Sequence, residues 1–177
     1  MEDEENMDGN MLEERFEFRE IRPEEAEQAA QIERMCFPPN EACTEEMMYR
    51  RVHRAPEQFL TAVDKKSGKL AGFLNGLSTR ELRFRDEFFT DETLHAPDGK
   101  TVMLLGLDVL PEYRGIGLAR RLVCEYARRE RERGRRLLLL TCLPEKVGMY
   151  EKFGFLDNGI ADSSWGGEAW HEMEMKL

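Results

Sequence analysis

Apolar residues along this chain switch repeatedly between strand-type runs and helical spacing, and the switches fall at turn-forming residues. The stretch "RFEFREIR" places Phe16 and Phe18 on one face and predicts a first strand. Pro23 then begins a helix that ends at "CFPPNEAC", and Thr44 is a good N-cap for a second helix that ends before Pro56. One strand followed by two helices is therefore predicted for this part of the chain.

The middle of the chain predicts two paired strands and then a central one. "QFLTAVD" and "KLAGFLNGL" flank a Lys-Ser-Gly turn, which is typical of an antiparallel hairpin. The polar stretch from Thr79 to Gly99 is longer than most connections inside a compact domain, so we expect it to be functional or partly helical. "TVMLLGLDVL" predicts a central strand, in which Gly106 marks a bulge or a close backbone approach.

The last part of the chain predicts a strand–helix–strand unit. A helix from Leu118 to about Arg133, closed by Gly134, leads into the buried strand "RRLLLLTCL", and such a crossover makes the flanking strands parallel. A short helix over residues 147–152 precedes "GFLDNG" and the alternating "EAWHEMEMKL". These elements predict an α/β protein with a central mixed β-sheet of about seven strands and helices on both faces.

Negative charge is concentrated at the N-terminus. Of the net charge of −10, residues 1–14 account for −7, with seven acidic side chains and no Lys or Arg. Since this tail is poor in core-forming residues, we expect it to be disordered, and we expect residues 15–177 to form a single domain. The sequence shows neither a membrane-spanning apolar stretch nor a signal-peptide pattern, so we expect a cytoplasmic protein with no membrane partner.

Cysteine and histidine residues are too scattered along the chain for a zinc pattern. They are Cys36, Cys43, Cys124, Cys142, His53, His95 and His171. In a cytoplasmic chain we expect reduced, mostly buried thiols and no metal site.

Two glycines stand where the central strand passes into the following helix, in Arg114-Gly115-Ile116-Gly117. Glycine lets backbone N–H groups approach a ligand, and the N-terminus of a helix favours an anion, so a phosphate or pyrophosphate is the expected ligand. The turn is neither a Walker loop nor a dinucleotide-binding fingerprint, because Arg120 stands where the third glycine would be. Without its context, Gly-x-Gly is equally consistent with a tight turn that binds nothing.

The residues around this glycine turn make the signal specific. Arg114 to Ala119 resembles the Arg/Gln-x-x-Gly-x-Gly/Ala signature of the GCN5-related N-acetyltransferase (GNAT) superfamily, and "LDVLPEYRG" and "MYEKFGF" resemble other hallmarks of that family. The long stretch before the fourth strand, the "CFPP" segment and the spacing from Cys142 to "YEKFGF" are most similar to the arylalkylamine (serotonin-type) N-acetyltransferases. The resemblance implies the GNAT fold over residues 15–177. It also implies transfer of an acetyl group from acetyl-CoA to the primary amine of a small acceptor, by direct attack in a ternary complex without a metal.

The resemblance also implies roles for individual residues. The thioester arm and the pyrophosphate of the cosubstrate would bind along Leu107, Asp108, Val109, Arg114, Gly115, Ile116, Gly117, Leu118, Ala119 and Arg120. Tyr150 would be the general acid, since a phenol with a pKa of about 10 stays protonated at neutral pH until the thiolate leaves. The acceptor would lie against Phe37, Pro38, Met103, Leu105 and Thr141.

One departure from the arylalkylamine enzymes concerns the general base. Their two histidines on the fourth strand correspond to Met103 and Leu105 here, so the base must lie elsewhere or be water. Strand alternation points Asp108 away from these two residues, towards a helix or the surface, unless a bulge re-aims it. Other candidates are Glu41, Glu45, Glu46 and His53. A non-catalytic acyl-CoA-binding or regulatory module, and acetylation of a protein or peptide amine, therefore stay open as alternatives.

Two further patterns bear on partners. The run "ARRERERGRR" could contact the 3′-phosphate of the cosubstrate or a nucleic acid, but basic residues are favourable at a helix C-terminus without any ligand. Met47 and Met48 could add to an apolar acceptor pocket, although methionines at helical spacing are more often core. We expect a small-molecule amine as partner, no nucleic acid, and a monomer or homodimer.

Overall fold

The computed structural model describes residues 2–177, with side chains from residue 9 onward. It contains one seven-stranded mixed sheet in the order β1-β2-β3-β4-β5-β7-β6, which confirms the predicted architecture. The strands are β1 (Phe16–Glu20), β2 (Phe59–Asp64), β3 (Leu70–Thr79), β4 (Thr101–Val109), β5 (Leu137–Cys142), β6 (Leu156–Ile160) and β7 (His171–Lys176). The α-helices are α1 (Glu2–Arg15), α2 (Ala26–Cys36), α3 (Glu45–Arg54), α4 (Glu87–Thr90), α5 (Leu118–Glu132) and α6 (Val147–Lys152).

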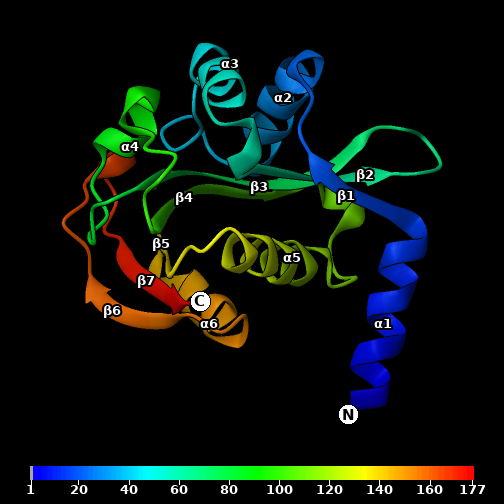
Figure 1. The fold of residues 1–177 in the computed structure, drawn as a ribbon. Coiled ribbons are helices and arrows are strands. Elements are labelled where there is room, and N and C mark those ends of the chain that lie inside the picture. The colour runs from blue at the N-terminus through cyan, green and yellow to red at the C-terminus, as the bar shows by residue number, and fades with distance from the viewer. Residues whose placement is uncertain (1) are drawn as a thin grey trace.

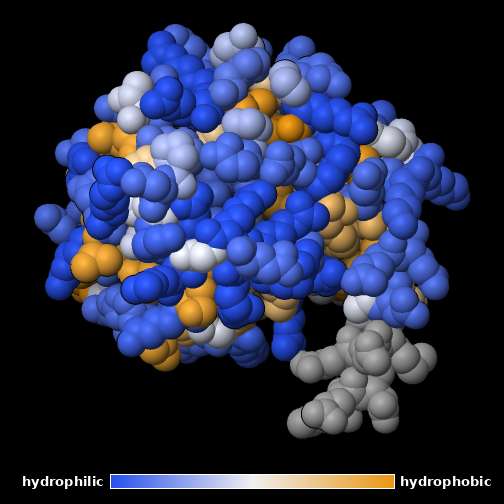
Figure 2. Space-filling model, viewed as in Figure 1, coloured by the Kyte–Doolittle hydropathy of each residue, from blue (hydrophilic) through white to orange (hydrophobic). Residues whose placement is uncertain are grey.

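Helices cover both faces of the sheet, with α2, α3 and α4 on one face and α5 and α6 on the other (Figure 1). Leu122 and Tyr126 of α5 are buried in the core on their side, and Ala30 of α2 and Met48 of α3 are buried on the opposite side. Met48 is fully buried, so it is a core residue and does not line a pocket. The surface in the same view is mainly hydrophilic, with hydrophobic residues in small groups (Figure 2).

Local signals in the sequence set several boundaries. Thr44 caps α3, because its hydroxyl accepts the backbone N–H of Met47 at 3.1 Å. Gly134 adopts a φ of +79° directly after α5, the left-handed conformation that commonly ends a helix. The polar stretch after β3 is partly helical, since it contains α4. None of the helices in the described part of the chain is long and apolar enough to cross a membrane.

β4 and β5 run side by side for only part of their length. They pair in parallel from Thr101↔Leu137 to Met103↔Leu139. Beyond these pairs, β4 continues to Val109 while β5 pairs with β7 on its other side. The backbones of β4 and β5 therefore separate towards their carboxyl ends, which opens the sheet at this point.

A bulge in β4 decides which way its side chains point. Asn75 of β3 pairs with Gly106 while the next residue pairs with Leu104, so Leu105 is an extra residue in the ladder. A bulge of this kind shifts the alternation of side chains by one position. Asp108 consequently lies on the same face as Met103, under α2, and is fully buried. Asp108 faces a helix, as expected, and the bulge has re-aimed it to the Met103 face, the exception that the expectation from strand alternation left open.

The acidic segment that was predicted to be disordered is a helix, α1. Leu12 is buried against Leu118 and Leu122 in the core beneath α5. Glu13 pairs with Arg121 at 2.7 Å, and its carbonyl accepts a hydrogen bond from Lys65. One apolar anchor and two basic partners thus hold the end of an otherwise polar segment against the domain, whose packing begins before residue 15.

Candidate active site

A cleft of about 590 Å³ lies where β4 and β5 separate. Its walls come from the open end of β4, the turn before α5, the end of β5 and α6, and the loops that follow α2 and β6. Leu107, Gly115 and Tyr150 line this one cavity although they are far apart in the sequence. The cleft therefore brings together the predicted thioester, pyrophosphate and general-acid residues.

The glycine turn leaves room for a ligand. Gly115 and Gly117 have φ values of +76° and +84°, a conformation that other residues rarely adopt. A Cβ built on Gly115 would meet nothing within 4 Å, so the backbone there is open to a ligand. Gly117 is the N-cap of α5, whose first N–H groups have no intrahelical acceptor. These features fit a pyrophosphate group.

The other residues predicted for this part of the site fall into two groups. Leu118, Ala119 and Arg120 line the cleft, as do Leu107, Val109 and Arg114. The side chains of Asp108 and Ile116 do not; Ile116 is exposed to solvent. Arg114 donates from Nε to the Val109 carbonyl at 2.9 Å, which ties the start of the turn to the end of β4.

Tyr150 of α6 is half-buried at the wall of the cleft. Its ring packs edge-on against Phe153 and Phe155, at centroid distances of 6.1 and 5.6 Å. Burial raises the pKa of Tyr150 above its ordinary value, and the acidic groups of Cys142 and Asp108 raise it further. The phenol therefore stays protonated at neutral pH.

Four of the five residues predicted for the acceptor site line the cleft. They are Phe37, Pro38, Leu105 and Thr141. Met103 does not reach the cleft, because it is fully buried with Leu77 and Phe88 in the core beneath α4. Its side chain lies before the bulge, where β4 is still paired with β5.

An aromatic wall that sequence reasoning missed closes the acceptor end of the cleft. Phe89 stacks on Trp165 at a centroid distance of 4.7 Å and an interplanar angle of 28°. The indole N–H of Trp165 donates to the Glu41 carbonyl at 2.9 Å, and that of Trp170 donates to the Trp165 carbonyl at 2.8 Å. The one signal for this wall was a pair of tryptophans in a polar, glycine-containing loop.

Among the four residues suggested as bases, Glu41 alone lines the cleft. Burial raises its pKa, and the carboxylates of Glu168 and Glu145 raise it further. Glu45 pairs with Arg34 at 3.6 Å, Glu46 pairs with Arg50, and His53 stacks on Tyr49.

A second acidic residue of the cleft was not predicted. Glu33 of α2 is buried, lines the cleft and lies next to Asp108. Burial raises the pKa of Asp108 well above its usual range, and the neighbouring Glu33 carboxylate raises it further. The helical pattern could not reveal this residue, because a glutamate in a helix is most often exposed.

All four cysteines are free thiols. Cys43 and Cys142 are buried, and burial raises the pKa of each to about 12. Cys36 is half-buried and Cys124 is exposed. In the described part of the chain, no group of three or more His, Cys, Asp or Glu residues is arranged to hold a metal ion.

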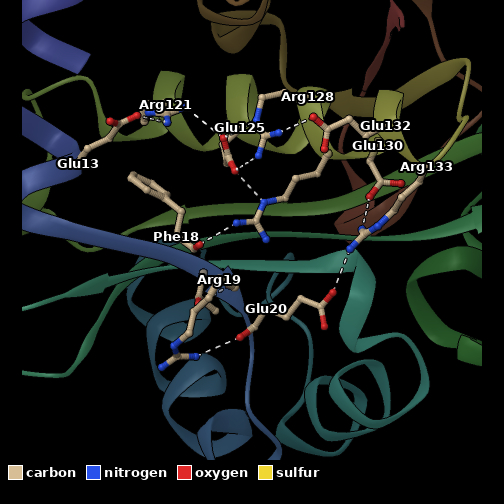
Figure 3. A network of polar contacts seen from close by, with 12 residues as sticks. Glu13, Phe18, Arg19, Glu20, Arg121, Glu125, Arg128, Glu130, Glu132 and Arg133 are labelled. Carbon is tan, nitrogen blue, oxygen red and sulfur yellow. Dashed lines mark hydrogen bonds and ion pairs between the residues drawn. The ribbon is translucent and has the colours of Figure 1, made fainter. Parts of the chain in front are cut away.

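Arginines of the basic run at the C-terminal end of α5 form ion pairs within the domain (Figure 3). Arg128 and Arg129 both pair with Glu125 at 2.8 Å, and Arg133 pairs with Glu130 at 2.6 Å. Although burial alone would raise it, hydrogen bonds from Arg128 and Arg129 lower the pKa of Glu125 to about 2. These arginines bind carboxylates of the same domain, in agreement with the interpretation that the basic run needs no ligand.

Comparison with known proteins identifies the class. The model of the acetyltransferase (GNAT) family matches residues 26–155, and this chain belongs to that family. No curated protein matches it by sequence.

Solved structures share the fold. A GphF GNAT-like decarboxylase in complex with isobutyryl-CoA is 17% identical with a TM-score of 0.78, covering 90% of this chain and 98% of its own. The loading GNATL domain of CurA from Lyngbya majuscula is 15% identical with a TM-score of 0.78, covering 91% and 97%. The PaiA N-acetyltransferase from Thermoplasma acidophilum, in complex with coenzyme A, is 17% identical with a TM-score of 0.68, covering 92% and 99%. At these identities the likeness shows the fold.

Proposed function

We propose that this protein is an acetyl-CoA-dependent N-acetyltransferase that acetylates the primary amine of a small apolar acceptor by direct attack in a ternary complex. One observation carries the proposal: the open edge of β4, the glycine turn at the start of α5 and Tyr150 all line the same cleft. Coenzyme A compounds in GNAT-fold neighbours agree with it. Acetyl-CoA supplies the activated acetyl group as a thioester.

The chain's own groups divide the work. The backbone of Leu107 to Val109 would hold the thioester arm, because this part of β4 has lost its β5 partner. The N–H groups from Gly115 to Arg120 would bind the pyrophosphate at the positive end of α5. Tyr150 would donate its proton to the departing thiolate, which its raised pKa keeps available.

The acceptor end suits an apolar amine. Phe37, Phe89 and Trp165 supply aromatic rings to the cleft, and Glu41 lines the same cleft. An aromatic surface with one acidic group matches a hydrophobic body that carries an ammonium group. We place the protein in the cytoplasm, where its free thiols are stable, as a monomer or homodimer.

The test is a panel of arylalkylamines, alkylamines and short peptides, assayed for release of free CoA, with calorimetry of acetyl-CoA binding on the same sample. Turnover on a small apolar amine is expected. Turnover on peptides alone would identify a protein acetyltransferase. Tight acetyl-CoA binding without turnover on any amine would favour the non-catalytic acyl-CoA-binding module.

A further inference from the structure

Three polar side chains converge on Gly106, at the bulge of β4. A Cβ built there would lie 3.0 Å from Asp108 Oδ1, 3.5 Å from Glu33 Oε2 and 3.5 Å from Asn75 Nδ2. Glu33 comes from α2, Asn75 from β3 and Asp108 from β4. Their exposed fractions are 3%, 1% and 0%. We call these three residues the Gly106 cluster.

Most polar atoms of the Gly106 cluster are unpartnered. Within the described residues, Glu33 Oε2, both carboxyl oxygens of Asp108 and both amide atoms of Asn75 have no hydrogen-bond partner. Each buried polar atom in this state destabilises a protein, because it has lost its hydrogen bonds to water without replacement. Such a group in a folded protein is explained by a proton, a water molecule or a ligand that it binds.

Adjacent buried carboxyl groups cannot both ionise, because each charge opposes the other. Burial and the neighbouring Glu33 raise the pKa of Asp108 well above its usual range, which assigns the proton of the pair to Asp108. Glu33 Oε1 accepts the backbone N–H of Cys43 at 3.2 Å.

Other ionisable groups surround the cluster. They are the thiols of Cys36 and Cys43, the phenol of Tyr150, and the guanidinium groups of Arg51 and Arg114, which act on the two thiols. Over the part of the chain with described side chains, neither arginine forms an ion pair with Glu33 or Asp108. Arg51 donates to the Phe89 carbonyl at 2.8 Å, and Arg114 donates to the Val109 carbonyl. Among the described side chains, neither arginine therefore supplies a counter-charge to the two carboxyl groups.

The cluster opens to the cleft. Glu33 and Gly106 both line it, beside the stretch of β4 where we place the thioester. Because Gly106 has no side chain, the space into which the three polar groups point stays free. A proton can therefore pass from the cleft to Glu33, directly or through one water molecule.

We propose that Glu33 is the general base of the acetylation, and that Asp108 and Asn75 are positioning residues for it. The inference rests on the proposed function. An N–H bond of the acceptor ammonium breaks and an O–H bond forms on Glu33; the freed electron pair on nitrogen then attacks the thioester carbonyl carbon. As the C–S bond breaks, Tyr150 protonates the departing thiolate, and the second amine proton passes to the Tyr150 phenolate, which restores the phenol. Glu33 returns its proton to solvent, so the step needs no further reactant.

The test compares Glu33→Gln with wild type, using the best amine of the panel and an analogue that is less basic. For an arylalkylamine these are 2-phenylethylamine and 2,2-difluoro-2-phenylethylamine, whose fluorines lower the pKa of the ammonium group. Glu33→Gln should lower kcat about 100-fold at pH 7 with 2-phenylethylamine, the usual scale for one general base. The deficit should shrink as pH approaches the pKa of the amine, and it should be much smaller with the fluorinated amine.

Two controls separate this role from a structural one. Glu27→Gln alters an exposed glutamate of the same helix and should leave kcat unchanged. Glu41→Gln tests the other acidic residue of the cleft. One outcome would overturn the inference and leave the proposed function standing. In it, Glu41→Gln lowers kcat in a way that rising pH relieves, while Glu33→Gln retains wild-type kcat at pH 6 and 7. If the wild type binds acetyl-CoA but acetylates no amine, both fail.

The shared proton can be measured without turnover. The infrared C=O band of a protonated carboxyl group should be present in the wild type at pH 7 and absent in Asp108→Asn. Wild type without this band, or Asp108→Asn with it, would overturn the assignment of the proton to Asp108.

Discussion

Replacing Gly117 by valine tests the pyrophosphate site most directly. Gly117 has a φ of +84°, which a β-branched residue adopts only with strain. A Cβ built there would contact a Leu12 methyl group at 3.9 Å, so the protein itself offers no clash. The strain alone should destabilise the protein by about 1–2 kcal/mol, which lowers Tm by roughly 3–6 °C at this chain length.

The effect on binding should be much larger than the effect on stability. The added methyl groups stand at the turn where the pyrophosphate would approach the backbone, and the strained turn moves the N–H groups that would bind it. We expect the Kd of acetyl-CoA, measured by calorimetry, to rise at least 100-fold, equivalent to about 2.7 kcal/mol. The variant must still be folded, which its thermal transition reports.

Gly68→Val is the matched control. Gly68 has a φ of +72° in the turn between β2 and β3, and a Cβ there would meet nothing within 4 Å. The variant should lose a similar amount of stability and bind acetyl-CoA normally. If Gly117→Val binds acetyl-CoA with wild-type affinity, the assignment of the turn is refuted; if both variants lose binding equally, the loss reflects strain alone.

Three further outcomes are expected. Tyr150→Phe should lower kcat about 100-fold with little change in KM for acetyl-CoA or in Tm, and an unchanged kcat would exclude the general-acid role. Glu125→Gln should destabilise the protein by about 1–3 kcal/mol at pH 7 in urea unfolding. The pKa of Glu125 is about 2 in the folded protein, so its stabilising effect is present above the unfolded pKa and is lost as pH falls through about 2. Equal stability of variant and wild type at pH 7 would contradict the role of Arg128 and Arg129. Asp108→Asn should gain stability relative to wild type as pH rises above about 4, because Asp108 then ionises in the unfolded chain while its raised pKa disfavours ionisation in the folded chain; an unchanged difference would count against its raised pKa.

Most of the secondary structure follows from local patterns in the sequence. The Thr44 cap, the turn before Gly117 and the closing Gly134 act through their own neighbours, so they are readable without the fold. The parallel β4 and β5 follow from the helix between them, because such a crossover cannot be made by a tight turn. The family resemblance, carried by the same local motifs, led to the cleft and to Tyr150.

The N-terminal helix shows where composition alone misleads. Charge density predicted disorder for residues 1–14, since few residues there can enter a core. In the structure, burial of Leu12 and the pairing of Glu13 with Arg121 anchor the end of this segment. Arg121 is more than a hundred positions away, and a partner at that distance has no local signature.

The proposed base and the shape of the proposed acceptor site depend on tertiary structure. One extra residue in β4, Leu105, changes the face to which Asp108 points, and only the pairing with β3 reveals that shift. Glu33 becomes significant because α2 crosses β4 at Gly106. The aromatic wall likewise needs Phe89 of α4 and Trp165 of the segment between β6 and β7, which are far apart in the sequence. The sequence by itself determined the elements and the cosubstrate motif, because these depend on neighbours along the chain, whereas the contacts that complete the site depend on strand register and helix crossing.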